Sequence, residues 1–78
     1  MNDPRTTLAL DRLEVGRDGC VDRIETRDVR RLEALSSLGI VPGSMLRLLQ
    51  NRVAVVVRVG ETEVALDSAV ARQIRVLL

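Results

Sequence analysis

The sequence reads Leu32-Glu33-Ala34-Leu35-Ser36-Ser37-Leu38-Gly39-Ile40-Val41-Pro42-Gly43-Ser44 at its most informative point. We predict a helix that ends at Gly39, because glycine enters the left-handed backbone region of a helix cap without steric cost. Such a cap lets Ile40 fold back onto Leu35. Pro42 cannot continue a helix, and Pro42-Gly43 is a typical turn pair. The stretch therefore predicts a helix, a tight bend and the start of a strand.

Downstream of this bend, runs of valine and leucine predict short strands. The expected strands are 44–49, 53–59, 62–66 and 74–77, with a single helical turn over 68–73 that is capped by Asp67. The connections Gln50-Asn51-Arg52 and Gly60-Glu61 are short enough only for tight hairpins. The C-terminal half is therefore expected to be almost entirely extended.

Upstream of the bend, we expect strands over 7–10 and 19–25, joined by a turn over 11–16. Val21 and Ile24 are the expected core residues of the second strand. Their odd-even mismatch predicts a bulge near Asp22 and Arg23, because side chains alternate between faces along a regular strand.

The helix itself is expected to begin at Thr26 as its N-cap, with Asp28 in the first turn near the positive end of the helix dipole. Apolar residues recur at every third position, which predicts a short helix with a broad buried face formed by Val29, Leu32, Leu35 and Leu38.

These elements exclude a parallel sheet, because the crossover connections that parallel strands need are missing. We predict a mainly β fold with one short helix, arranged as a small, partly open barrel whose closure removes sheet edges. Residues 1–6 are expected to form a flexible leader and residues 7–78 a single domain.

The composition excludes several classes of function. There are no aromatic, lysine or histidine residues, and twelve arginines face eleven carboxylates for a net charge of +1. That balance provides no general attraction to nucleic acid or anionic lipid. The single cysteine, Cys20, excludes a disulfide framework, and the N-terminus lacks the apolar core of a secretory signal. We therefore expect a cytoplasmic protein.

The residue types in this chain give little support for catalysis. No histidine or lysine is present to act as a base, Cys20 has no obvious activator, and Glu61 and Glu63 are expected to be solvated on a hairpin. The protein is therefore not expected to be an enzyme or to take a small-molecule substrate.

A metal site is a weaker candidate. Asp18, Cys20 and Asp22 alternate, so an unbent strand would place them on one face, where two carboxylates and a thiolate could hold Fe²⁺ or Zn²⁺. The competing interpretation is an ordinary solvated strand face. No cofactor is predicted, and an association with Fe²⁺ stays open.

Direct nucleic-acid binding is not expected either. The only local concentration of arginine, at 23, 27, 30 and 31, is interleaved with carboxylates at 22, 25, 28 and 33. Such a pattern is typical of a charge-balanced, solvated surface.

Docking to another protein fits the sequence best, because the bend offers a rigid surface and the valine strand after it is apolar on both faces. The candidate contact residues are Leu38, Gly39, Val41, Pro42, Gly43, Ser44, Val56 and Arg58. The competing interpretation is structural: the glycines set the bend, and Leu38 and Ile40 fill the core.

The order of residues resembles the FeoA family along nearly the whole chain, from about residue 7 to residue 77. The most specific block is Leu38-Gly39-Ile40-Val41-Pro42-Gly43-Ser44. It is accompanied by Thr7-Leu8, Gly16, Gly19-Cys20-Val21, Ile24, Arg31-Leu32-x-x-Leu35, Val55-x-Val57-Arg58-Val59-x-x-Thr62-x-Val64-Ala65-Leu66 and Ala71-x-x-Ile74-Arg75-Val76.

This resemblance implies an SH3-like barrel without enzymatic activity that accompanies FeoB, the membrane ferrous-iron transporter with a cytoplasmic G-domain. The same fold occurs in DtxR-type metal-dependent repressors, so a regulatory role stays open, as does self-association. Two positions depart from the family pattern. Gln50-Asn51-Arg52 stands where members often carry a Gly-Asp-Pro loop, and Asp67 stands where they often place a basic residue.

Overall fold

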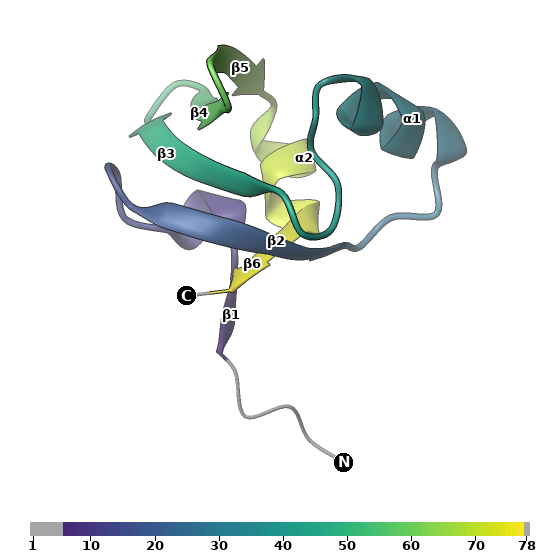
Figure 1. Ribbon diagram of the computed structural model, residues 1–78, viewed down its shortest axis with the longest axis horizontal. Coiled ribbons are helices and arrows are strands. Elements are labelled where there is room, and N and C mark those ends of the chain that lie inside the picture. Colours follow the sequence, from purple (N-terminus) through teal and green to yellow (C-terminus); the bar gives the residue numbers. More distant parts are fainter. Residues whose placement is uncertain (1–5, 78) are drawn as a thin grey trace.

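The structure is a computed structural model that describes residues 6–77 (Figure 1). Its strands are β1 Thr7–Ala9, β2 Asp18–Ile24, β3 Met45–Asn51, β4 Val55–Val59, β5 Thr62–Leu66 and β6 Ile74–Leu77. Its helices are the 3-10 helix η1 Leu10–Arg12 and the α-helices α1 Val29–Ser37 and α2 Ser68–Gln73. The predicted leader lies, up to residue 5, outside the described residues.

All six strands form one antiparallel sheet in the order β1-β6-β2-β3-β4-β5. Within the described part of the chain, β1 and β5 are the two free edges, so the curved sheet does not close on itself. The predicted mainly β, partly open barrel is confirmed. Neither α-helix of residues 6–77 has the length and apolar character needed to cross a bilayer.

The core consists of aliphatic side chains from every strand, β1 contributing only the buried Ala9, together with residues of the connecting elements. On β4 and β5, alternate residues point inward, as the period of a half-buried strand requires. The core cluster contains Leu10, Leu13, Val21, Leu35, Ile40, Leu46, Leu48, Val55, Val57, Val64, Leu66, Ala71, Ile74 and Val76.

The helix α1 ends at the predicted place and in the predicted way. Gly39 has a φ of +87°, and the two backbone bonds of a Schellman cap are formed, from Ile40 N to Leu35 O at 2.9 Å and from Gly39 N to Ser36 O at 2.9 Å. Leu35 and Ile40 both lie in the core. This cap turns the chain from α1 back onto the sheet.

The start of α1 and its buried face differ from the prediction. The N-cap is Asp28, whose carboxylate accepts hydrogen bonds from the backbone N–H groups of Arg30 and Arg31. Thr26 instead accepts a bond from Asp28 N at 3.1 Å, because it lies in the turn before the helix. Leu35 is the only buried residue of α1, and Val29 is 63% exposed. In Figure 1, α1 stands to one side of the sheet.

The bulge expected near Asp22 is present, since the pairing of β2 with β6 shifts register between Val21 and Arg23. A second irregularity between Leu48 and Gln50 was not expected. It lets β3 extend to Asn51, so the hairpin turn moves to residues 52–54 and β4 begins two residues later than predicted. Val53 is consequently 98% exposed in this turn.

Replacing Gly39 with alanine tests the importance of the cap. A residue with a Cβ is strained at this φ, and the new atom would lie 3.4 Å from Val59 Cγ1. We expect Gly39→Ala to lower the free energy of unfolding by about 1–2 kcal/mol in urea titrations. Ser36→Ala, on the exposed side of α1, is the control and should stay within about 0.5 kcal/mol of the parent. Equal stability of both variants would contradict this account.

Candidate functional site

The bend between α1 and β3, residues 38–44, is held from within by Ser44. Its hydroxyl donates to Gly39 O at 2.7 Å and accepts from Val41 N at 3.2 Å. Its own backbone N–H donates to Val41 O at 2.9 Å, which closes the turn over Pro42 and Gly43. Gly43 has a φ of +93°, as a type II turn with proline at its first central position requires.

The bend is also attached to the sheet. Gly43 N donates to Val21 O at 2.7 Å, and Val21 N donates to Ser44 O at 2.8 Å, so the turn extends the pairing of β2. Gly39 packs close to Val59 at the end of β4. Gly39, Gly43 and Ser44 are therefore explained by the architecture, and any contact surface must come from the side chains around them.

Three of those side chains are apolar and open to solvent: Leu38 is 40% exposed, Val41 38% and Met45 58%. The interpretation that places Leu38 in the core is therefore wrong, whereas it is correct for Ile40, which is 0% exposed. Met45 was missed by the sequence reasoning. Alternation with Leu46, which is buried, would have placed it on the outer face. We call Leu38, Val41 and Met45 the apolar corner.

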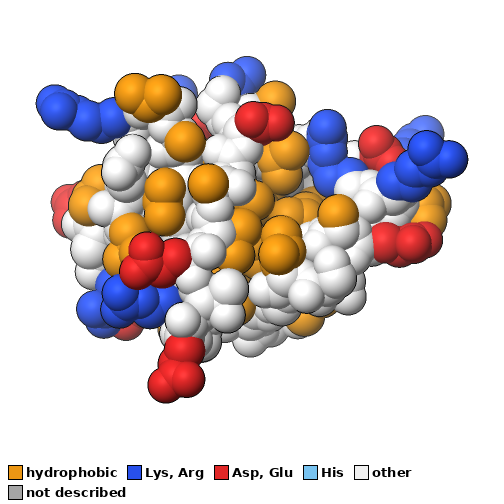
Figure 2. All heavy atoms as spheres, turned by 90° about the horizontal axis from the view of Figure 1, so that it is seen from above, with side chains coloured by type: hydrophobic (Ala, Val, Ile, Leu, Met, Phe, Trp, Pro, Cys, Tyr) orange, Lys and Arg blue, Asp and Glu red, His pale blue; other side chains and the backbone are white. Residues whose placement is uncertain are grey.

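Seen from above, hydrophobic side chains gather in the middle of the molecule, between the strands β3–β5 and the helix α1 (Figure 2). Charged side chains lie mostly toward the two ends of the same view. A rigid, apolar surface bordered by charges has the composition typical of a protein contact site.

The two candidates on β4 lie on its outer face, as alternation predicts. Val56 is half-buried, and Arg58 is exposed and bonded to Glu63 of β5 at 3.2 Å. Arg58 and Met45 line the same shallow, open depression, whose other members are Asp18, Leu46, Arg47 and Gly60. The structure therefore brings Arg58 next to the apolar corner.

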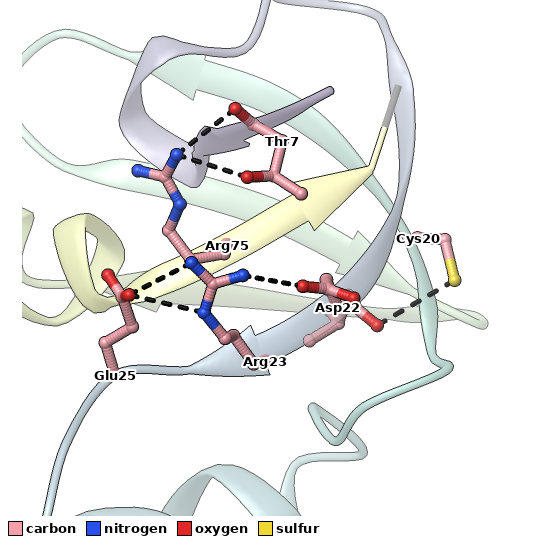
Figure 3. A network of polar contacts seen from close by, with 7 residues as sticks. Thr7, Cys20, Asp22, Arg23, Glu25 and Arg75 are labelled. Atoms are coloured by element: carbon pink, nitrogen blue, oxygen red, sulfur yellow. Dashed lines mark hydrogen bonds and ion pairs between the residues drawn. The ribbon is translucent and has the colours of Figure 1, made fainter. Parts of the chain in front are cut away.

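The three metal candidates on β2 do not form a ligand group. Asp18 is bound by Arg47, with Nε 2.7 Å from Oδ1, and Asp22 is bound by Arg23 at 2.8 Å. Figure 3 shows the Asp22 carboxylate directed at Arg23, on the bulged part of the strand. Within residues 6–77, no three cysteine, aspartate or glutamate side chains are placed to hold a metal ion together.

Several arginines of the described residues are matched by acceptors on neighbouring elements. Hydrogen bonds to Asp22 and then Glu25 raise the pKa of Arg23, and the neighbouring Arg75 donates to Thr7 O at 3.1 Å (Figure 3). Arg31 donates to Gln73 Oε1 at 2.8 Å. These guanidinium groups therefore help to hold the strands and the helix together.

The Asp18–Arg47 pair has a measurable electrostatic signature. The hydrogen bond from Arg47 lowers the pKa of the Asp18 carboxyl below its ordinary value, and the same pair raises the pKa of Arg47. Because the folded-state pKa of Asp18 is lowered, its contribution to stability is present above the ordinary carboxyl pKa and is lost as pH falls through the lowered value.

Arg47→Gln should raise the pKa of Asp18 back toward 3.8, the ordinary value, because the main cause of the lowering is removed. Carboxyl-carbon NMR titration measures this directly. Arg72→Gln, on α2, is the control and should leave the Asp18 titration unchanged. An Asp18 pKa that does not move in the Arg47 variant would show that the bond is not maintained in solution.

The chain is similar to known proteins over almost its whole length. A family model described as the FeoA domain matches residues 8–78. A crystal structure of an iron uptake regulatory protein (FeoA) superposes with a TM-score of 0.83 at 23% identity, covering 94% of this chain and 99% of that one. A search of the curated proteins found no significant match.

Two longer proteins contain a similar unit. A manganese-dependent transcriptional repressor gives a TM-score of 0.87 at 29% identity over 96% of this chain and 43% of that one. The solution structure of iron(II) transport protein A from Clostridium thermocellum gives 0.77 at 25% identity over 91% and 45%. The present chain thus spans less than half the length of these two relatives.

Proposed function

Since this chain belongs to the FeoA family, we propose that it is a cytoplasmic, non-enzymatic adaptor of ferrous-iron uptake that binds the cytoplasmic part of a FeoB-type membrane transporter. The observation that carries this proposal is the apolar corner. Its residues Leu38, Val41 and Met45 stay exposed although the chain is small and has a well-filled core. Exposed apolar groups on a rigid support are a typical protein docking surface.

Rigidity of the support favours binding. The Schellman cap, the Ser44 hydroxyl and the two backbone bonds to Val21 all hold the corner in place before any partner arrives. A preorganised surface loses little conformational entropy on association, so more of the contact free energy remains as binding affinity. Pro42, at the tip of the turn, further limits the motion of the backbone.

The sequence inventory supports an adaptor over an enzyme. Histidine and lysine are absent from the whole chain, which removes the commonest general bases. Two relatives carry iron transport or iron uptake in their names, and this agrees with a role beside an iron transporter.

The test is binding of purified chain to the purified cytoplasmic domain of the transporter, measured by calorimetry. Leu38→Asp and Val41→Asp should each weaken binding about tenfold or more, because a charge must then be buried against the partner. Val53→Asp is the matched control, since Val53 is 98% exposed on the β3–β4 turn. It should bind like the parent.

Copurification from cells provides the second measurement. Tagged chain should capture the transporter, and Leu38→Asp should not. If the capture pattern were the same in a strain that lacks the transporter, or if Val53→Asp failed as completely as Leu38→Asp, the adaptor role at this corner would be wrong. Sedimentation of each variant distinguishes loss of the partner from loss of self-association.

A regulatory module is the second candidate, and the likeness to the manganese-dependent transcriptional repressor favours it. Such a module would act together with a separate metal-responsive DNA-binding protein. Deletion of the chain would then change promoter occupancy by that protein, and transport through a constitutively expressed transporter would be unaffected. The adaptor predicts the reverse result in both measurements.

A further inference from the structure

Four charged side chains form a row across the outer face of β2, β3, β4 and β5. They are register partners from strand to strand: Asp18 opposite Arg47, Arg47 opposite Arg58, and Arg58 opposite Glu63. The two outer carboxylates bind the two inner guanidinium groups, at 2.7 Å for Asp18–Arg47 and 3.2 Å for Glu63–Arg58. The row therefore has negative ends and a positive centre.

The four charges of the row sum to zero, but the two arginines are neighbours at its centre and each has its carboxylate partner on the outer side only. Like charges directly opposite one another on neighbouring strands repel, and each arginine of this pair is neutralised from one side only. A guanidinium group carries more N–H donors than one carboxylate uses, so Arg47 and Arg58 both retain donors. Both arginines line the shallow depression, which is open to solvent.

The surroundings of the depression select the kind of anion. Asp18 and Glu63 at the ends of the row would repel a chain of phosphates but leave room for one negative group at the centre. No aromatic side chain is present in the protein to stack on a base. Met45, which lines the same depression and belongs to the apolar corner, offers an apolar contact beside the anion site.

We propose that Arg47 and Arg58 together bind a carboxylate side chain of the partner protein, and that apolar residues next to this carboxylate pack on Met45. The partner segment is thus acidic and apolar. This inference rests on the proposed function for the identity of the partner, but the anion site itself follows from the charge row. Guanidinium–carboxylate hydrogen bonds are among the stronger polar contacts that proteins make.

Substitutions in the four charged residues distinguish an effect on partner binding from an effect on the stability of the fold. Arg47→Gln and Arg58→Gln should weaken binding of the transporter's cytoplasmic domain about tenfold. Asp18→Asn and Glu63→Gln break the same internal ion pairs but free the arginines, so they should bind as tightly as the parent or about twofold tighter. If the pairs mattered only for folding, both kinds of variant would lose affinity together, and that result would overturn the proposal.

A synthetic probe makes the test independent of the transporter. A peptide of glutamates and leucines should bind the parent chain, lose affinity in the arginine variants, and bind less well when its glutamates are replaced by glutamines. Arginine-dependent peptide binding without any transporter binding would reject the proposed partner and support the carboxylate site. If the arginine variants bound the transporter as tightly as the parent chain, the carboxylate site would be wrong and the adaptor role would be unaffected.

A single-stranded oligonucleotide of mixed sequence is the remaining probe. We expect it to bind far more weakly than the acidic peptide at physiological salt, because Asp18 and Glu63 oppose neighbouring phosphates. Tighter, arginine-dependent binding of the oligonucleotide would overturn the assignment of the site to a carboxylate.

Discussion

The left-handed backbone at Gly39 is the constraint on which the architecture depends. It stops α1, directs Ile40 into the core and delivers the chain to the turn that pairs with Val21. Only glycine adopts this conformation without strain while packing close to Val59. Because the bend from Leu38 to Ser44 also carries the exposed Leu38 and Val41, the fold and the proposed docking surface share one local structure.

Strand register, more than composition, determines the electrostatics of this protein. The net charge of +1 does not show how the charges are arranged. Strand pairing places arginines opposite particular carboxylates and, at one point, opposite each other. Exposed pairs of this kind contribute little to stability, since water screens them. Their arrangement can nevertheless discriminate between ligands, because discrimination depends on where charges lie and whether they are already satisfied.

Much of the fold could be predicted from sequence because it is encoded locally. The cap at Gly39, the bulge in β2, and the bounds of β5, α2 and β6 all follow from residue type and short-range pattern. The buried face of α1 could not be predicted, because a stripe of apolar residues does not show whether the helix rests flat on the sheet. Here Leu35 alone reaches the core.

The candidate site was predictable in part for the same reason. The bend is contiguous in sequence and could be found directly. The charge row joins Asp18, Arg47, Arg58 and Glu63, which lie on four strands, and becomes visible only once register is known. The pairing of β3 with β4 shifts register between Leu48 and Gln50, and the residue types at these positions give no sign of the shift.

The shallow attachment of α1 has a consequence for its outer side. Leu35 is its only buried residue, and Arg31 ties the helix to Gln73 of α2. An exposed position such as Val29 can therefore be replaced without removing a core contact. The outer side of α1 is thus open to a change of sequence, while the glycine-terminated bend after it keeps the strands in place.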